Sequence, residues 1–321
     1  MAKIVCTSFL FPDEVARLEA AGHTVWVYDG GLPIPRERLL EELADAEGLL
    51  CLLTDSIDQE ILRASRCLRV VANVAVGYEN VDVAAARERD IVVTNTPDVL
   101  TEATADLTFA LLLAAARRIA EADVAVRRGE FPSWGLDQEL TGTDVYGKTL
   151  GIVGMGRIGT AVARRGQSGF GMRVVYHSRS RDEAAERDLD AEFMPFDRLL
   201  AESDFVSVHV PLTDGTRHLF DRSAFAHMKR TAILVNVARG PVVDEEALVR
   251  ALETGEIAGA GIDVFEHEPD VHPGLIRLRE RVVLTPHLGS ATRETRRAMA
   301  KLAVGNVLAV LDGRDPATPV S

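Results

Sequence analysis

The stretch KTLGIVGMGRIG, residues 148–159, decides the fold of this chain. Within it, the apolar run 150–153 predicts a strand, and a G-x-G-x-x-G pattern follows at Gly154, Gly156 and Gly159. The next residues, TAVARRGQSG, have the pattern of a helix, which completes the order that a dinucleotide fingerprint requires. Gly154 permits the tight turn, Gly156 lets the backbone approach a pyrophosphate, and Gly159 lets the helix pack on the strand. We therefore predict a dinucleotide site with its phosphates at the helix N-terminus.

Length and composition indicate a globular protein of two domains. The chain has 321 residues, of which 47% are hydrophobic and 26% are charged, so it holds enough apolar material for two cores. Its formal net charge is −13. Nucleic acids and anionic membranes bind basic surfaces, so we expect neither as a partner.

The cysteines and the N-terminus indicate a reducing compartment. Cys6, Cys51 and Cys67 lie in apolar runs, with no C-x-x-C spacing and no nearby His, so we expect free thiols and no metal site. The first residues, MAKIVCTSFLFPDEV, contain no long apolar segment and no small-residue cleavage site. No apolar run reaches the roughly 18 residues of a membrane span. We therefore expect no signal peptide, no membrane span and a cytoplasmic location.

Short apolar runs and helical patterns alternate along most of the chain. Before residue 100, we expect strands at 4–7, 23–28, 49–53, 70–74 and 91–95. After residue 147, we expect six strands, at 150–153, 173–176, 205–209, 232–236, 259–263 and 282–284. Residues 101–128 form one long helical pattern, and residues 291–311 form the last. Repeated βα units predict parallel sheets that are covered by helices on both faces.

This organisation predicts an α/β protein with two doubly wound parallel-sheet domains. The six later strands match a Rossmann dinucleotide-binding domain, which we place at residues 100–285. We expect the final helix to return to the first part of the chain. Residues 1–99 plus 286–321 then form a flavodoxin-like substrate domain, into which the Rossmann domain is inserted.

The segment after the second strand of the Rossmann domain bears on cofactor choice. An Asp or Glu about 20 residues after the glycines binds the ribose 2′-OH of NAD. Here that position holds Ser178, and Arg179 and Arg181 follow it. A hydroxyl and two guanidinium groups would bind a 2′-phosphate, whereas the alternative is a solvated basic loop. We predict a preference for NADPH, with NADH also accepted.

Motifs that follow the last three expected strands contain residues suited to carbonyl chemistry. Arg239 lies in NVARG, Glu268 in DVFEHEP and His287 in TPHLGS, and ligands of open α/β sheets bind beyond the carboxyl ends of the strands. An Arg binds a carboxylate in bidentate geometry, and a His donates a proton near neutral pH. A neighbouring carboxylate orients the His and stabilises its charged form. Each residue alone has a plain alternative as a loop or surface charge, but together they predict reduction of a 2-keto acid.

Several longer stretches are distinctive: NVAVGYENVD (73–82), NTPDVLTEATADLTFALLLAAARR (95–118), GTDVYGKTLGIVGMGRIG (142–159), HVPLTDGTRHLF (209–220), VNVARGPVVDEEAL (235–248), GAGIDVFEHEP (259–269) and LTPHLGSAT (284–292). Through them the sequence resembles the D-isomer-specific 2-hydroxyacid dehydrogenases over essentially the full chain. Within that family it is most similar to the glyoxylate/hydroxypyruvate reductase and 2-ketogluconate reductase branch, whose NADPH-preferring members share the SRSR segment.

The resemblance implies catalytic and substrate-binding roles. Arg239 would bind the substrate carboxylate and carbonyl, His287 would be the acid/base, and Glu268 would be its partner. Val76 and Gly77 lie in the loop whose backbone N–H groups would hold the substrate carboxylate.

The resemblance also implies a cofactor site and a dimer. Leu100 would line the substrate pocket, and Asp263 would anchor the nicotinamide carboxamide. Trp134 would reach a neighbouring active site across the interface of a homodimer, and its alternative is a plain interface hydrophobe. Further cofactor contacts are implied for Thr104, Arg157, Ile158, Pro211 and Thr216.

The leading hypothesis is an NADPH-dependent reductase of a small anionic 2-keto acid, which converts glyoxylate to glycolate and hydroxypyruvate to D-glycerate. A 2-ketogluconate reductase or another D-2-hydroxyacid dehydrogenase, including phosphoglycerate and D-lactate dehydrogenases, is the alternative among enzymes. From another class, a nucleotide-sensing protein similar to the corepressors of this family would keep the fold without turnover.

Overall fold

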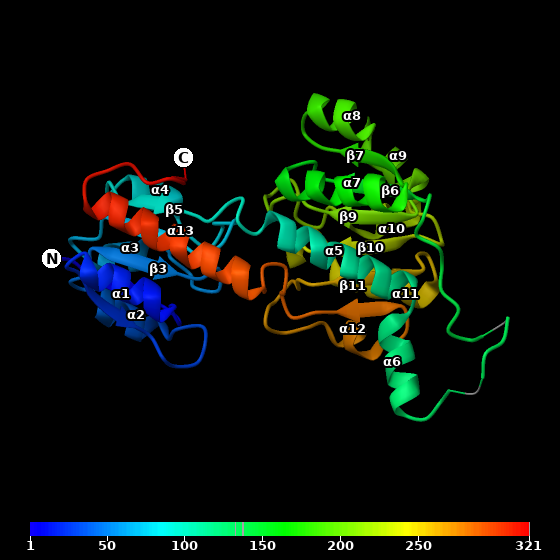
Figure 1. Cartoon of the computed structure of the whole chain (residues 1–321), viewed down its shortest axis with the longest axis horizontal. Helices are drawn as coiled ribbons and strands as arrows, with labels where there is room; N and C mark the ends of the chain where they lie inside the picture. The colour runs from blue at the N-terminus through cyan, green and yellow to red at the C-terminus, as the bar shows by residue number, and fades with distance from the viewer. Residues whose placement is uncertain (132, 137, 321) are drawn as a thin grey trace. The chain divides into compact units, whose positions relative to one another are not determined.

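The computed structural model describes residues 1–131, 133–136 and 138–320. Its chain divides into two compact units, one formed by Met1–Leu100 with Thr292–Ser321 and the other by Thr101–Ala291. Each unit has one sheet, and the paired strands of both sheets run parallel. Figure 1 shows helices on both faces of each sheet. The prediction of two parallel-sheet α/β domains is confirmed.

The first unit has five strands in the order β2-β1-β3-β4-β5, which is the flavodoxin-like order. Its elements are β1 (Lys3–Cys6), α1 (Pro12–Ala20), β2 (Thr24–Val27), α2 (Arg36–Leu43), β3 (Gly48–Cys51), α3 (Gln59–Ala64), β4 (Val70–Asn73), α4 (Val83–Arg87), β5 (Val92–Thr94) and α13 (Arg293–Leu311).

Alternation along β1 divides the core of this unit between the two faces of its sheet. Ile4 packs with Val304 and Val307 of α13, whereas Val5 packs with residues of α2 and α3. Successive side chains of a strand point to opposite faces, so one apolar strand supplies both cores. In Figure 1, α13 lies beside α1 on one face of the sheet, although the two helices are far apart in sequence.

The second unit has seven strands in the order β12-β11-β10-β9-β6-β7-β8. The chain leaves β6 toward β7 on one side and returns to β9 on the other, so a switch point lies between β6 and β9, where α/β sheets bind ligands. The elements of this unit are α5 (Thr101–Ala116), α6 (Ile119–Arg127), β6 (Thr149–Val153), α7 (Arg157–Phe170), β7 (Arg173–His177), α8 (Glu183–Leu189), β8 (Glu192–Phe193), α9 (Phe196–Glu202), β9 (Phe205–Val208), α10 (Arg222–His227), β10 (Ile233–Asn236), a 3-10 turn (Gly240–Val242), α11 (Glu245–Thr254), β11 (Gly259–Ile262), α12 (Pro273–Arg277) and β12 (Val282–Leu284).

The expected single helix over 101–128 is wrong, because two helices occupy this range. Arg118, between α5 and α6, has a left-handed φ of 52°, which ends the first helix. The carbonyl of Ala116 accepts a hydrogen bond from the N–H of Thr143, 2.9 Å away, and Gly142 packs against the same carbonyl. A returning segment therefore takes the carbonyl that a continuous helix would use. In the part of the chain that the structure describes, no helix is long and apolar enough to span a membrane.

The short strand β8 was not predicted from the sequence. β8 has only two residues, and Phe193 pairs with Tyr176 of β7 at the edge of the sheet. A strand this short has no measurable periodicity in sequence. The expected six strands are therefore seven in the structure.

Candidate active site

The glycine turn between β6 and α7 has the shape that a dinucleotide needs. Gly154 has a φ of +101°, and a Cβ there would lie 2.7 Å from the main chain of His209. A Cβ on Gly156 would meet no atom within 4 Å, so the turn is open where a pyrophosphate would approach. Gly156 is also the residue before α7, whose first N–H groups favour anions. These residues fit the pyrophosphate of a dinucleotide.

The predicted specificity residues follow β7, and one of them is bonded to this turn. The Ser178 Oγ accepts a hydrogen bond from the N–H of Met155 at 2.6 Å, which ties the segment to the glycine turn. Arg179 is exposed. Arg181 is also exposed, and its guanidinium binds Glu186.

Pro211 and Thr216 lie in the loop that follows β9. The Thr216 hydroxyl donates to the carbonyl of Pro211 at 2.6 Å and accepts the N–H of Thr213 at 2.8 Å. The structure therefore brings these two predicted cofactor residues together. Arg157 and Ile158 begin α7 directly after the glycine turn.

Glu268 and His287 form a hydrogen-bonded pair. The His287 Nδ1 donates to the Glu268 Oε2 at 2.8 Å, and the other carboxylate oxygen accepts the N–H of Phe265 at 3.0 Å. Burial is the largest single influence on the Glu268 carboxyl and raises its pKa, but the hydrogen bond and charge of His287 and the N–H of Phe265 lower it. The charge of Arg239 also lowers this pKa, so it lies below its usual value. Glu268 is therefore an ionised partner that orients the imidazole.

The turn that carries His287 is held by a buried carboxylate. Asp263 is fully buried at the end of β11, and it accepts the Thr285 hydroxyl at 2.6 Å. It also accepts the N–H groups of Leu288 and Gly289 at 2.7 and 2.9 Å. These bonds enclose His287, which has a left-handed φ of 54°.

Thr104 of α5 also forms a hydrogen bond to this turn. Its hydroxyl, on a residue only 4% exposed, donates to the carbonyl of Gly289 at 3.1 Å. The predicted cofactor residues Thr104 and Asp263 are thus bonded to the segment around His287. The carboxamide contact of Asp263 stays a prediction.

Arg239 follows β10, next to the segment that carries Glu268. The Asn236 Nδ2 donates to the carbonyl of Arg239 at 3.0 Å, and the Asn236 Oδ1 accepts the N–H of Ala238 at 3.0 Å. Gly240 lies directly against the main chain of Phe265, because a Cβ there would be 1.9 Å from the Phe265 carbonyl. The absence of a side chain at Gly240 therefore lets the Arg239 turn and the Glu268 segment touch.

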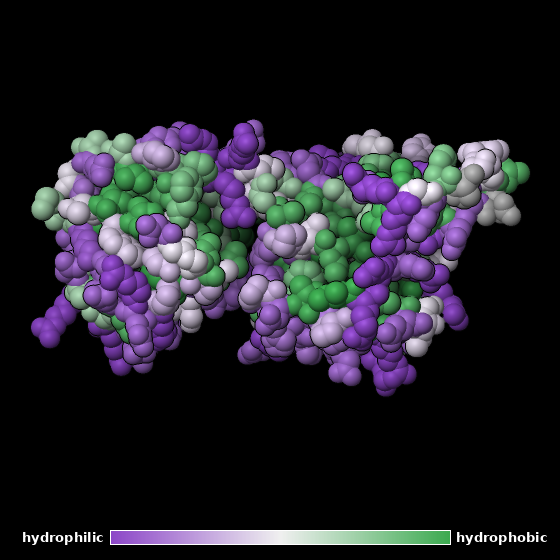
Figure 2. Space-filling model, turned by 90° about the horizontal axis from the view of Figure 1, so that it is seen from below, coloured by the Kyte–Doolittle hydropathy of each residue, from purple (hydrophilic) through white to green (hydrophobic). Residues whose placement is uncertain are grey.

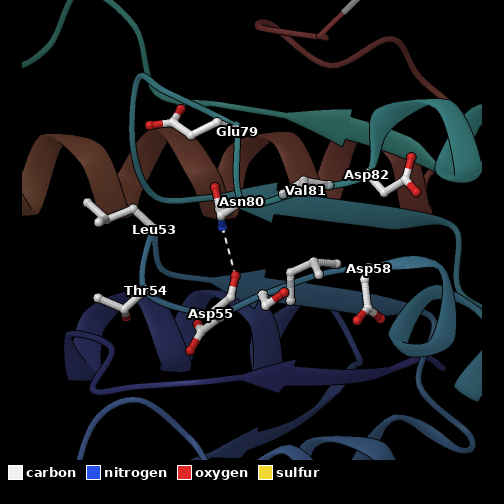
Figure 3. Close-up of a pocket in the computed structure, with 10 residues that line it drawn as sticks. Leu53, Thr54, Asp55, Asp58, Glu79, Asn80, Val81 and Asp82 are labelled. Carbon is white, nitrogen blue, oxygen red and sulfur yellow. Dashed lines mark hydrogen bonds between the residues drawn. The ribbon is translucent and has the colours of Figure 1, made fainter. Parts of the chain in front are cut away.

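Val76 and Gly77 belong to the first unit, in the loop after β4. Their carbonyls accept the side-chain amides of Asn95 and Asn73, at 2.7 and 2.8 Å. Among the described residues, no acceptor is bonded to the N–H of Val76 or Gly77. The loop therefore has its carbonyls bound internally and its amide donors available to an anion. A third amide, that of Asn80, donates to the carbonyl of Asp55 at 3.0 Å and fixes the loop to the neighbouring one (Figure 3).

The pocket drawn in Figure 3 is a poor site for an anionic substrate. It has a volume of about 320 Å³, and Asp58, Glu79 and Asp82 line it. Asp58 and Asp82 accept the N–H groups at the starts of α3 and α4, so two of these acids have a structural role. Like charges repel, so this acidic lining disfavours an anionic keto acid.

Leu100 and Trp134 complete the predicted substrate residues. Leu100 is buried in the first unit, whereas the Trp134 side chain is 76% exposed in the single chain.

The second unit of the chain matches a known protein family. Residues 109–289, more than half of the chain, match the model of the D-isomer specific 2-hydroxyacid dehydrogenase NAD binding domain. The chain belongs to this family. It is therefore an oxidoreductase that uses a nicotinamide dinucleotide, and the prediction of an enzyme is confirmed.

Individual relatives agree over nearly the whole chain. The glyoxylate reductase of Thermococcus onnurineus is 52% identical over 300 residues, which cover 92% of this chain and 89% of the relative. A crystal structure of a Thermus thermophilus protein is 48% identical and has a TM-score of 0.93, with 99% and 100% of the two chains covered. The NADPH-dependent glyoxylate/hydroxypyruvate reductase of Sinorhizobium meliloti, crystallised with NADP and malonate, is 34% identical, with a TM-score of 0.86 and 100% and 97% coverage.

The side chains that bind the main chain of the site were not predicted from the sequence. Asn73, Asn95 and Asn236 each bond to a carbonyl of a turn, and each stands at or just after the end of a strand. That position in sequence is the signal that would have found them, because turns at strand ends carry the ligand-binding loops.

We predict that Gly240→Ala disrupts the site. The added Cβ would force the Arg239 turn away from Phe265, and a displacement near 1 Å at a catalytic group costs about 100-fold in rate. Steady-state kcat checks this, with thermal unfolding to record the change in stability. Gly169→Ala in α7 is the matched control, because its Cβ would meet no atom within 4 Å. Equal kcat values for the two variants would contradict the prediction.

Proposed function

We propose that this enzyme reduces glyoxylate to glycolate and hydroxypyruvate to D-glycerate, with NADPH as the preferred cofactor. The observation that carries the proposal is the Glu268–His287 pair, 2.8 Å apart, beside the Arg239 turn. The names of the relatives support the substrate class, since several are glyoxylate reductases at about half identity. A 2-ketogluconate reductase is the second candidate.

The chain's own residues would bind the substrate and supply the proton. The nicotinamide cofactor, when bound at the glycine turn, supplies the hydride. The Arg239 guanidinium binds the carboxylate of the keto acid and polarises its carbonyl oxygen. His287, oriented by Glu268 through Nδ1, gives the proton of its other ring nitrogen to that oxygen, so the carbonyl becomes an alcohol.

The loop with Val76 and Gly77 would bind the substrate carboxylate. Its free N–H groups can donate to an anion, while Asn73 and Asn95 keep the two carbonyls turned inward. We assign the first unit to substrate binding on this basis and the second unit to the cofactor.

Two features support the NADPH preference. The position of the usual acidic residue holds Ser178, and Arg179 beside it is exposed. Ser178 is hydrogen-bonded to the glycine turn, and in Rossmann domains the residues at this position lie near the ribose, which supports a role for its neighbours in binding the 2′-phosphate.

We also propose a cytoplasmic enzyme without a nucleic-acid or membrane partner. Cys6, Cys51 and Cys67 are free thiols, which are typical of a reducing compartment. The net charge of −13 disfavours polyanionic surfaces.

The homodimer is a further part of the proposal. Ile119 and Val126 of α6 are exposed, as are Phe131, Trp134 and Leu136 in the segment after it. Large apolar side chains that are exposed in a single chain can be covered in an interface with a second copy, which supports this part of the proposal. On the face of the second unit seen in Figure 2, an apolar (green) area lies beside hydrophilic (purple) surface.

We predict that the wild-type enzyme oxidises NADPH with glyoxylate and hydroxypyruvate. His287→Ala removes the proton donor and lowers kcat by about 1,000-fold with the fold intact. The assay is NADPH absorbance with glyoxylate, hydroxypyruvate, 2-ketogluconate and pyruvate, repeated with NADH. No turnover with any of these acids, or an unchanged kcat in the variant, would contradict the mechanism. Faster turnover with NADH would contradict the cofactor assignment.

Asn95→Asp tests the carboxylate-binding loop. The aspartate repels the Val76 carbonyl, so the loop loses its orientation and the KM for glyoxylate rises by about tenfold. The KM for NADPH and the unfolding temperature serve as controls and stay close to wild type. An unchanged KM for glyoxylate rules out this role of the loop.

Trp134→Ala tests the dimer and the reach of Trp134 together. We expect the wild type to sediment at twice the 34.9 kDa chain mass. The variant stays dimeric but has a raised KM for hydroxypyruvate, while Phe131→Ala, in the same exposed segment, keeps the wild-type KM. A wild-type monomer refutes the interface, and equal KM values for the two variants refute the contribution of Trp134.

A further inference from the structure

The loop after β7 is fixed by a network around Tyr176. Tyr176 is buried, and its hydroxyl accepts the N–H of Asp182 at 2.7 Å. The same hydroxyl donates to the Glu186 Oε1 of α8 at 2.6 Å. These two bonds close the loop 177–182 onto the end of β7, next to α8 in Figure 1. Arg179 and Arg181 therefore stand on an ordered loop.

Glu186 also holds Arg181. The Arg181 Nε donates to the Glu186 Oε1 at 2.9 Å, and the Nη2 donates to the Oε2 at 2.6 Å. This is the bidentate geometry in which guanidinium–carboxylate pairs are most specific. The hydrogen bonds from Arg181 and Tyr176 lower the pKa of Glu186 to about 2, so the pair is charged on both sides at neutral pH.

This pairing has opposite consequences for the two cofactors. A 2′-phosphate that approaches Arg181 meets a guanidinium whose charge is already balanced, and it also meets the negative charge of Glu186. A ribose 2′-hydroxyl is neutral and can donate to a carboxylate, so Glu186 does not repel it. Arg179 has no such partner among the described residues and remains for the phosphate.

We propose that Glu186 is a cofactor-specificity residue that limits discrimination between NADPH and NADH by neutralising Arg181. The proposal rests on the proposed use of NADPH at this loop. It adds that only Arg179 attracts the 2′-phosphate fully, because Arg181 is bound to the carboxylate of Glu186, five residues further on. Removal of the Glu186 charge frees Arg181 and strengthens the selection of the 2′-phosphate.

Glu186→Gln is the variant that tests this proposal. Glutamine keeps an oxygen that accepts from Tyr176, so the loop stays closed while the negative charge is lost. We expect the ratio of kcat/KM for NADPH to kcat/KM for NADH to rise about fivefold over wild type, the range of one exposed ion pair. Binding of 2′,5′-ADP, measured by calorimetry, tightens by a similar factor, whereas binding of 5′-ADP is unchanged.

Two further variants identify the cause. Asp188→Asn removes a negative charge from the same helix, but Asp188 pairs with Arg187, so the cofactor ratio stays within about twofold of wild type. In an Arg181→Ala background, Glu186→Gln has no further effect on the ratio. A ratio that is unchanged or lower in Glu186→Gln, or a rise that persists without Arg181, would overturn the proposal. The ratio of kcat/KM for NADPH to kcat/KM for NADH in the wild type tests the NADPH preference by itself. The NADPH preference and the role of Glu186 can therefore fail independently.

Discussion

The buried carboxylate of Asp263 is the constraint on which the candidate active site depends. β11 and β12 are neighbours in the sheet, so Asp263 at the end of one strand lies beside the turn that follows the other. Its oxygens accept one hydroxyl and two N–H groups of that turn. Burial raises the pKa of the Asp263 carboxyl, whereas these hydrogen bonds favour its charged form. A turn fixed in this way can hold His287 in a left-handed conformation within reach of Glu268.

Side chains also bind the main chain of the turns at the other strand ends. Asn236 binds both sides of the Arg239 turn, and Asn73 and Asn95 bind the carbonyls of the Gly77 loop. In each case a short amide or carboxylate side chain takes up main-chain groups that a tight turn leaves unpaired. The chemically active groups are therefore placed by neighbours that need not touch a substrate. Such support is what holds catalytic geometry to within fractions of an ångström.

Sequence alone predicted most of the fold, because the apolar runs and the glycine turn are local signals. It also selected Glu268 and His287, 19 positions apart, which the structure joins by a hydrogen bond. The helix break at Arg118 was missed because its cause is a distant contact, in which Thr143 binds the Ala116 carbonyl. The ion pair between Glu186 and Arg181 was missed for a related reason. A basic cluster in the sequence does not reveal which carboxylate faces it.

Asp263→Asn tests the central claim most directly. The amide keeps the size of the side chain but replaces one acceptor oxygen with a donor, so the N–H groups of Leu288 and Gly289 cannot both be satisfied. The measurement is kcat for glyoxylate at saturating NADPH, with the Kd of NADPH from its fluorescence. The account predicts that kcat falls by about 100-fold while NADPH still binds. A kcat equal to that of the wild type would show that the turn around His287 does not depend on this carboxylate.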